Sequence, residues 1–298
     1  MKNILIIGCG LLGSSLLRRI KKKKIAKKIY IYEKSKVNIL KIKKLKLPGI
    51  IVNKLQDGVI KSDLIILCTP MSEYKNLILK MNKFLLPKTV ITDIGSSKLE
   101  TLKIIKKFLR KDIFWTSSHP ISGSEVSGPE HGKQDLFENK WCILIKDKKT
   151  KQKHLTLLNK FWKKIGAKVV LMTPEKHDKI FSITSHLPHL IAYNLVKSAQ
   201  DFEKKQNYDL IKFSAGGLRD FSRIAASNEI MWRDIFFNNS QNMRTAIDLF
   251  IKNLNSFKKD ISLKNNKSIL KKLIQTKKVR TKIIKLKQDI NKPDFGRS

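Results

Sequence analysis

The chain has 298 residues, 41% of them hydrophobic, which is enough for one or two domains with a buried core. Its three cysteines, Cys9, Cys68 and Cys142, show no paired spacing, which argues against a disulfide scaffold and favours a reducing, cytoplasmic setting. The formal net charge is +39, from 63 Lys and Arg against 24 Asp and Glu.

The strong positive charge has two interpretations. Basic proteins bind nucleic acids or anionic lipids by neutralising phosphates. Here, however, lysine largely replaces arginine, and the lysines are spread along the whole chain. We therefore expect a compositional bias and no specific nucleic-acid surface, although the charge can help to attract an anionic substrate.

An apolar stretch covers residues 4–17, but we expect neither a signal peptide nor a membrane anchor. The stretch contains three glycines at fixed spacing and is followed by a lysine cluster, which is the wrong polarity for secretion. It is also shorter than the ~20 residues that a membrane-spanning helix needs. The sequence predicts a soluble protein with no membrane partner.

Short apolar runs alternate with helical patterns up to about residue 170. Strands are expected at residues 3–7, 29–32, 64–68 and 90–92, and further strands of the same sheet at 114–117 and 142–145. Helices are expected from residue 14 and at 73–84 and 99–109. This alternation predicts an α/β fold, a Rossmann-type, doubly wound parallel sheet, in residues 1–172.

After residue 172 the pattern becomes almost entirely helical. Helices are expected at residues 185–197, 211–213, 220–226, 230–237 and 243–257, from apolar residues at three- and four-residue spacing. We therefore expect an all-helical second domain over residues 173–298. Its basic tail, residues 258–292, holds 13 Lys and Arg and 2 Asp and Glu, and predicts a terminal helix packed on a partner.

Gly8, Gly10 and Gly13 form a G-x-G-x-x-G motif between the first expected strand and the first expected helix. These glycines permit a tight turn, close approach of the backbone to a pyrophosphate and close packing of helix on strand. Leu11 and Leu12 of this turn are further candidates for cofactor binding, and the start of the helix that follows offers free amides to phosphate. The motif predicts a dinucleotide site; a glycine turn that binds nothing is the alternative.

Glu33 follows the second expected strand, 20 residues beyond Gly13. A carboxylate at this place accepts hydrogen bonds from ribose hydroxyls and repels a 2′-phosphate, so we expect NAD in preference to NADP. The adjacent Lys34 weakens that preference. Thr69 and Pro70 end another expected strand at the edge where ligands of such sheets collect, although a plain turn is the alternative.

His119 precedes a Pro- and Gly-rich loop, so we do not expect it in the core. A neutral imidazole near pH 7 can accept the proton of a hydroxyl group while hydride leaves the same carbon. His119 is therefore our first candidate for a catalytic base. Ser96 could orient this histidine, or Ser96 or Asp93 could simply cap the next helix.

His186 and His189 lie three residues apart at an expected helix start. We expect no metal site, because no third ligand has suitable spacing. A histidine that faces an anionic ligand is the preferred interpretation, and a capping or packing role for His186 is the alternative.

A glycine pair, Gly216 and Gly217, precedes an expected helix that carries Arg219 and Arg223 on one face. An arginine can hold a carboxylate through two parallel hydrogen bonds, and the alternative is a surface salt bridge, for example with Asp220.

The next helical segment carries Trp232. A tryptophan on a helix is most often part of the core, but Trp232 could also form the wall of a substrate pocket.

Together these motifs resemble those of the prephenate dehydrogenase family, which includes arogenate and cyclohexadienyl dehydrogenases. The resemblance covers roughly residues 1–260. Beside the glycine motif it rests on Asp-x-Gly-Ser-x-Lys at 93–98, His-Pro-Ile-x-Gly-x-Glu-x-Ser-Gly at 119–128, Ser-His-Leu-Pro-His at 185–189, Asp-Phe-Ser-Arg-Ile-Ala at 220–225 and Met-Trp-Arg-Asp at 231–234.

The resemblance implies an oxidative decarboxylation in tyrosine biosynthesis. Hydride would pass from C4 of prephenate to NAD, and loss of the ring carboxylate as CO2 would give 4-hydroxyphenylpyruvate. His119 would accept the proton of the C4 hydroxyl, and Ser96 would orient His119. The family also implies a helical domain that forms a homodimer.

The same resemblance implies how the substrate is held. Arg223 and His189 would bind its carboxylate end, and the pocket would be lined by Ser124, Glu125, Gly216, Gly217 and Trp232. Arogenate is the alternative substrate. The alternative class is another oxidoreductase with a Rossmann and a helical domain, such as a β-hydroxyacid dehydrogenase. Because there is no room for a further segment before Lys2, we expect no fused mutase, and because a basic tail follows residue 260, we expect no regulatory domain.

Overall fold

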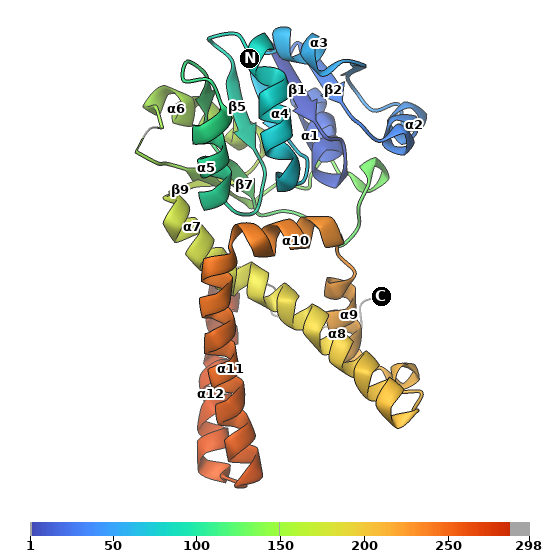
Figure 1. Cartoon of the computed structure of the whole chain (residues 1–298), viewed down its shortest axis with the longest axis vertical. Coiled ribbons are helices and arrows are strands. Elements are labelled where there is room, and N and C mark those ends of the chain that lie inside the picture. The colour runs from blue at the N-terminus through green and yellow to red at the C-terminus, as the bar shows by residue number, and fades with distance from the viewer. Residues whose placement is uncertain (1, 149, 287–298) are drawn as a thin grey trace.

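The structure is a computed structural model that describes residues 2–148 and 150–286. An α/β region extends to residue 172, and a helical region follows it (Figure 1). In Figure 1 the α/β region lies above the helical region, from which two arms of long helices project downwards.

The main sheet has six parallel strands in the order β3-β2-β1-β4-β5-β6, which is the order of dinucleotide-binding sheets. The strands are β1 (Asn3–Ile7), β2 (Lys28–Tyr32), β3 (Ile50–Ile51), β4 (Leu64–Leu67), β5 (Val90–Asp93) and β6 (Phe114–Trp115). Between them run α1 (Leu11–Lys22), α2 (Lys36–Lys44), α3 (Leu55–Ile60), the 3-10 turn η1 (Met71–Glu73), α4 (Tyr74–Met81) and α5 (Leu99–Phe108). The expected doubly wound α/β sheet is confirmed.

A second sheet corrects one expectation. β7 (Ser118–Pro120) pairs antiparallel with β8 (Trp141–Ile145), and β8 pairs parallel with β9 (Lys168–Met172), which follows α6 (Gln152–Ile165). The run at 142–145, expected on the main sheet, therefore belongs to this smaller sheet. An apolar run predicts a buried strand but does not say which strand it pairs with, because pairing partners are decided by contacts distant in sequence.

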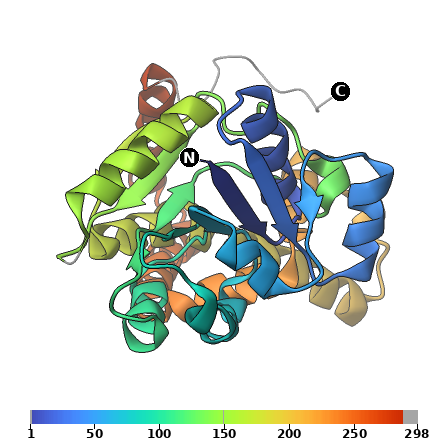
Figure 2. The same cartoon turned by 90° about the horizontal axis from the view of Figure 1, so that it is seen from above.

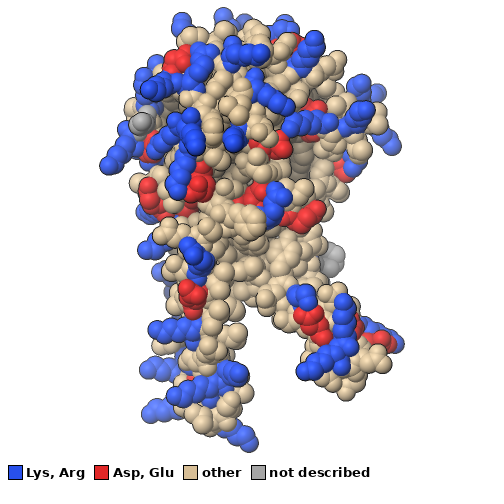
Figure 3. Space-filling view, viewed as in Figure 1, with Lys and Arg blue, Asp and Glu red and all other residues tan. Residues whose placement is uncertain are grey.

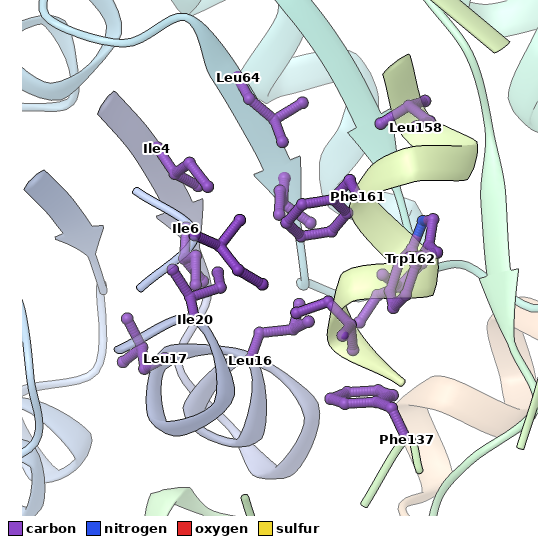
Figure 4. Packing of buried hydrophobic residues seen from close by; sticks show 14 of the residues in the cluster. Ile4, Ile6, Leu16, Leu17, Ile20, Leu64, Phe137, Leu158, Phe161 and Trp162 are labelled. Atoms are coloured by element: carbon purple, nitrogen blue, oxygen red, sulfur yellow. The ribbon is translucent and has the colours of Figure 1, made fainter. Parts of the chain in front are cut away.

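Side chains of the central strands alternate between the two faces of the main sheet. Ile4 and Ile6 of β1 pack with α1 and with Trp162 of α6 (Figure 4). Leu5 and Ile7 instead join the cluster formed with α3 and α4. Because both faces are covered by helices, as the view from above shows (Figure 2), these strands are continuous apolar runs.

The helical region consists of α7 (Pro174–Phe181), a π-helical turn (Ser182–His186), α8 (Leu187–Gln206), the 3-10 turn Ile211–Phe213, α9 (Gly216–Ala225), α10 (Glu229–Asn238), α11 (Ser240–Ser262) and α12 (Asn266–Lys285). The expected helical second half is confirmed. α12 packs along α11 of the same chain as a hairpin (Figure 1). The end of the predicted basic tail, residues 287–292, lies outside the described residues.

The helix start expected at residue 185 is wrong. α7 continues through the π-helical turn into α8 without a break, and His186 has helical backbone angles. Pro188 lies just after this turn and cannot donate a backbone hydrogen bond inside a helix. The π-helical turn just before it changes the hydrogen-bond register locally, which lets the helix pass through the proline.

Lys and Arg side chains are scattered over the visible face of the α/β region and along the α11–α12 hairpin (Figure 3). Within the part of the chain that the structure describes, no helix is both long and apolar enough to cross a membrane.

Candidate active site

The glycine motif forms the turn from β1 into α1. Gly8 has a φ of +88°, a conformation that side chains other than glycine rarely adopt. A Cβ atom on Gly13 would lie 2.1 Å from the carbonyl oxygen of Gly8, so only glycine allows this packing. A Cβ on Gly10 would meet nothing within 4 Å, and no side chain caps the helix start at Leu11 and Leu12. The turn is therefore an open cradle of backbone amides that suits a pyrophosphate.

Glu33 lies beside this cradle. Its carboxylate accepts hydrogen bonds from the backbone amides of Cys9 (2.7 Å) and Ser35 (2.9 Å), which hold it at the edge of the turn. The Nζ atom of Lys34 lies 2.5 Å from Oε2 of Glu73. The lysine charge next to Glu33 is thus matched by a carboxylate.

Thr69 and Pro70 follow β4 directly beside the cradle. The Thr69 Cγ2 atom would be 2.9 Å from a Cβ on Gly8, and the Thr69 hydroxyl is buried without a hydrogen-bond partner. Buried hydroxyls are nearly always hydrogen-bonded, so an unpartnered one at this edge fits a polar ligand. The residues present therefore fit a dinucleotide.

The helical region contacts the turn after β4. The carboxylate of Asp234 on α10 accepts a hydrogen bond from the backbone amide of Ser72 (2.8 Å).

His119 lies on β7 and is only 8% exposed, so the expectation that it avoids the core is wrong. Its Nδ1 atom lies 2.7 Å from Nε2 of His177, and Nδ1 of His177 lies 2.7 Å from Oδ1 of Asp178. The ring of Phe181 packs against both imidazoles. Burial, followed by the nearby charges of His177 and Lys98, lowers the pKa of His119 well below its usual range, so the ring is neutral at neutral pH.

A buried lysine joins the strand of His119 to the carboxyl end of β5. The Nζ atom of Lys98 donates to Oδ2 of Asp93 (2.7 Å) and to the carbonyl oxygen of Ser118 (2.7 Å). Both side chains of this ion pair are 0% exposed. The pair places His119 at the same edge of the main sheet as the glycine cradle.

The cap of α5 comes from the helical region. Asp178 accepts hydrogen bonds from the amides of Lys98 (2.9 Å) and Leu99 (2.9 Å). Capping by Asp93, one of the sequence alternatives, is therefore wrong, because its carboxylate faces Lys98.

Ser96 is half-buried in the turn before α5. The hydrogen bonds of residues 2–148 and 150–286 include none between its hydroxyl and His119, so its orienting role stays a prediction.

His186 and His189 lie on one continuous helix. Nδ1 of His186 lies 3.1 Å from the Asn239 amide nitrogen, and burial lowers the pKa of His186 to about 4. The ring of His189 stacks on Trp232, with ring centroids 3.8 Å apart, and its Nδ1 lies 2.9 Å from the carbonyl oxygen of Ser185. Because a carbonyl only accepts, the proton of neutral His189 is on Nδ1 and Nε2 holds a lone pair.

Arg223 reaches from α9 to the loop after β7. Its Nη1 atom lies 3.5 Å from Oε2 of Glu125 and its Nη2 atom 3.7 Å from Oδ1 of Asp220, while its Nε is buried without a partner. Ser124 donates to the same Glu125 oxygen (2.8 Å). Two residues taken from separate motifs, Glu125 and Arg223, thus meet, and the expected contact with Asp220 is also present.

Gly216 and Gly217 form the first turn of α9 instead of preceding it, and a Cβ on either would meet nothing within 4 Å. Packing does not require glycine there, and the pocket role of this pair stays a prediction. Trp232 is 5% exposed and joins a core cluster, yet its indole nitrogen is buried without a partner. Its position in the core is confirmed, and its role in the wall of a substrate pocket stays a prediction.

Sequence reasoning missed His177 and Asp178. Both are 0% exposed, on a helix whose buried face otherwise carries Pro174 and Phe181. Two ionisable residues on a buried helix face were the available signal. Nothing in the local pattern links them to His119, which lies 58 residues earlier.

This arrangement defines a class of protein. A glycine cradle and a buried neutral histidine share one edge of a Rossmann sheet, and an arginine faces that edge from a helical region. These are the parts of a dinucleotide-dependent oxidoreductase. Among residues 2–148 and 150–286, no three His, Cys, Asp or Glu side chains come together in a metal-binding arrangement.

Comparison with known proteins identifies the family: the chain belongs to the prephenate dehydrogenases. Residues 16–171 match the nucleotide-binding domain of prephenate dehydrogenase, and residues 173–287 match its dimerization domain. The alternative class of β-hydroxyacid dehydrogenases is thereby set aside, and the chain is an oxidoreductase of this family.

Named relatives cover nearly the whole chain. It is 33% identical to the cyclohexadienyl dehydrogenase of Zymomonas mobilis, over 94% of this chain and 95% of the relative. It is 32% identical to the prephenate dehydrogenase of Bacillus subtilis, over 86% of this chain and 69% of the relative. The crystal structure of prephenate dehydrogenase from Aquifex aeolicus, in complex with hydroxyphenyl propionate and NAD+, has a TM-score of 0.88 at 34% identity and covers 95% of this chain and 98% of that one.

Proposed function

We propose that this chain catalyses the oxidative decarboxylation of prephenate to 4-hydroxyphenylpyruvate with NAD as the hydride acceptor. The observation that carries the proposal is the buried, neutral His119 at the sheet edge that also holds the glycine cradle. The names of the relatives, and the ligands of the Aquifex aeolicus enzyme, support the same reaction.

The bound cofactor and His119 would have separate roles in the reaction. When bound, NAD supplies the site to which hydride moves from C4 of the substrate. His119 accepts the C4 hydroxyl proton at Nε2, since its Nδ1 is taken up by His177. Burial of the imidazole keeps water away from the base. Loss of CO2 then makes the ring aromatic and leaves the electron pair on the C4 oxygen, to which protonated His119 returns the proton to give the 4-hydroxyl group of the product.

The environment of Glu33 supports NAD in preference to NADP. Its carboxylate is fixed by two backbone amides and would face the 2′ position of a bound ribose, where a phosphate would be repelled. Lys34, the cation that could offset this repulsion, is paired with Glu73. NADP remains the less favoured cofactor in this proposal.

Arg223 and His189 are the proposed contacts for the substrate carboxylate, and Ser124, Glu125, Gly216, Gly217 and Trp232 are proposed to line the pocket. A guanidinium with an unpartnered buried Nε supports the role of Arg223. Neutral His189 offers an acceptor at Nε2, so it holds a carboxylate only when it is protonated. The same lone pair would suit the ammonium group of arogenate, which is therefore the second candidate substrate.

We also propose that the chain is divided into domains at residue 172 and acts as a homodimer through its helical domain. In the single chain α8 buries only Leu187 and Ala192, and α9 and α12 bury no residue. Large apolar side chains are left exposed along this region, among them Phe202, Phe213, Phe237, Leu249 and Leu254. Helices with so little internal packing are stabilised by a partner surface.

The deciding experiment is NADH formation at 340 nm with purified protein, in parallel with prephenate or arogenate and with NAD or NADP. Turnover of prephenate with NAD is expected. Turnover of arogenate alone would show that arogenate, and not prephenate, is the substrate. Turnover with NADP alone would show that NADP is the cofactor. If the protein binds NAD but turns over neither substrate, the proposal is rejected. Sedimentation equilibrium tests the dimer.

A further inference from the structure

Three buried side chains form one hydrogen-bonded chain behind the proposed base. His119, His177 and Asp178 are 8%, 0% and 0% exposed, and both ring-to-partner distances are 2.7 Å. Each imidazole nitrogen in such a chain must either donate or accept, so the protons can be assigned by starting from the group whose role is fixed.

Asp178 determines which atom donates in each hydrogen bond of this three-residue network. Its Oδ2 atom accepts the amide of Leu99 (2.9 Å), and the amide of Lys98 lies 2.9 Å from Oδ1 and 3.1 Å from Oδ2. Backbone amides only donate, and the start of α5 favours an ionised carboxylate. Oδ1 is therefore an acceptor, and Nδ1 of His177 carries the proton that lies between them.

The assignment then passes to His119. Burial lowers the pKa of His177, so this ring is neutral at neutral pH and, with its proton on Nδ1, its Nε2 can only accept. Nδ1 of His119 must be the donor. One neutral imidazole carries one proton, so Nε2 of His119 is left with a lone pair.

Burial and the charge of Lys98 outweigh the carboxylates of Asp178 and Asp93, which favour a proton on His177, so the pKa of His177 is lowered on balance. The groups that face His119 are Lys98 from the turn before α5, His177 and Phe181 from α7 and His186 from the π-helical turn. A cationic form of His177 would reverse the bond to His119, and the buried ammonium of Lys98 disfavours it.

We propose that His177 and Asp178 are positioning residues that hold His119 in the tautomer with its lone pair on Nε2, the atom that takes the substrate proton. This inference rests on the proposed function for the identity of the substrate. The assignment of the tautomer rests only on the hydrogen bonds among His119, His177 and Asp178.

Two variants test the proposal in opposite ways. In Asp178→Asn the side-chain oxygen stays on the α5 amides and the NH2 group faces His177, which reverses the chain and moves the proton of His119 to Nε2. In His177→Gln the amide can still accept from His119 and donate to Asp178, so the tautomer is kept. His177→Leu offers neither bond and frees the ring of His119.

The direct readout is a long-range 1H–15N spectrum of histidine-labelled protein without cofactor or substrate, with the His119 signals assigned from a His119→Asn variant. We expect protonated Nδ1 in the wild type and in His177→Gln, and protonated Nε2 in Asp178→Asn. In hydrolase triads the equivalent Asp→Asn change lowers kcat about 10⁴-fold through the wrong tautomer. Here we expect a loss in kcat of at least about 100-fold, with KM changed less than about 3-fold.

His154→Gln is the matched control, because His154 is buried on α6 against the ring of Phe114, away from this chain. It should change neither the His119 signals nor kcat. Protonated Nε2 in the wild type, or an unchanged His119 in both Asp178→Asn and His177→Leu, would overturn the proposal. If the tautomer is as assigned but the wild type turns over neither prephenate nor arogenate, the proposed function fails and the assignment stands.

Discussion

Arg223 of α9 and Glu125 of the loop after β7 lie 3.5 Å apart, Nη1 to Oε2, although 98 residues separate them in sequence. Arg223 belongs to the helical region and Glu125 to the segment that begins with His119. The contact therefore brings a cation from the second half of the chain to the edge of the sheet where the base lies.

Arg223→Ala should weaken substrate binding, because a charge-assisted hydrogen bond to a carboxylate contributes about 1.5–3 kcal/mol. We expect KM for prephenate to rise about 10- to 100-fold. Arg219→Ala, one turn earlier and exposed on the same helix, is the control and should change KM less than about 2-fold. Steady-state kinetics with both variants checks this, and equal effects would contradict a specific role for Arg223.

The glycine turn allows packing to be separated from binding. Gly13→Ala places a methyl group 2.1 Å from the Gly8 carbonyl, so we expect a loss of several kcal/mol in unfolding free energy. Gly10→Ala meets nothing within 4 Å and should fold normally, while its methyl group stands where the pyrophosphate approaches and raises the Kd for NAD at least about 10-fold. Urea unfolding and fluorescence titration measure the two effects. Normal NAD binding by Gly10→Ala would contradict the assignment of the cradle.

The activity should persist to mildly acidic pH. Burial lowers the pKa of His119 well below 6.5, and the base works only when it is neutral. Activity is therefore lost as pH falls through this lowered pKa, and the acidic limb of kcat/KM should have its midpoint below about 6.5, the value of an ordinary histidine. A pH profile of kcat/KM tests the point, and a midpoint above that value would argue that a different group limits the rate.

Lys98 should be essential for stability. Lys98→Met removes the ammonium and leaves the carboxylate of Asp93 buried without its countercharge, which costs about 3–5 kcal/mol. Lys103→Met breaks an exposed ion pair with Glu100 on α5 and should cost less than about 0.5 kcal/mol. Urea unfolding of both variants gives the comparison. Similar unfolding free energies for the two variants would mean that the buried Lys98–Asp93 ion pair does not stabilise the fold more than an exposed pair does.

The Rossmann sheet, the helical second half and the glycine turn could all be predicted from the sequence, because they depend on local patterns. Apolar runs, helical spacing and the conformational freedom of Gly8 act over a few residues. His119 and Arg223 were also recognisable, since each lies in a short motif whose residue types suit the chemistry.

Features that depend on contacts between residues distant in sequence became visible only in the folded chain. The tertiary structure assigned β8 to the second sheet, because an apolar run does not specify its pairing partner. It replaced the helix start expected at residue 185 by a π-helical turn within one continuous helix. It also brought His177 and Asp178 behind His119, 58 residues away, and that contact decides which nitrogen of the base is free. A hydrogen-bonded chain of this kind exists only once α7 has packed against β7.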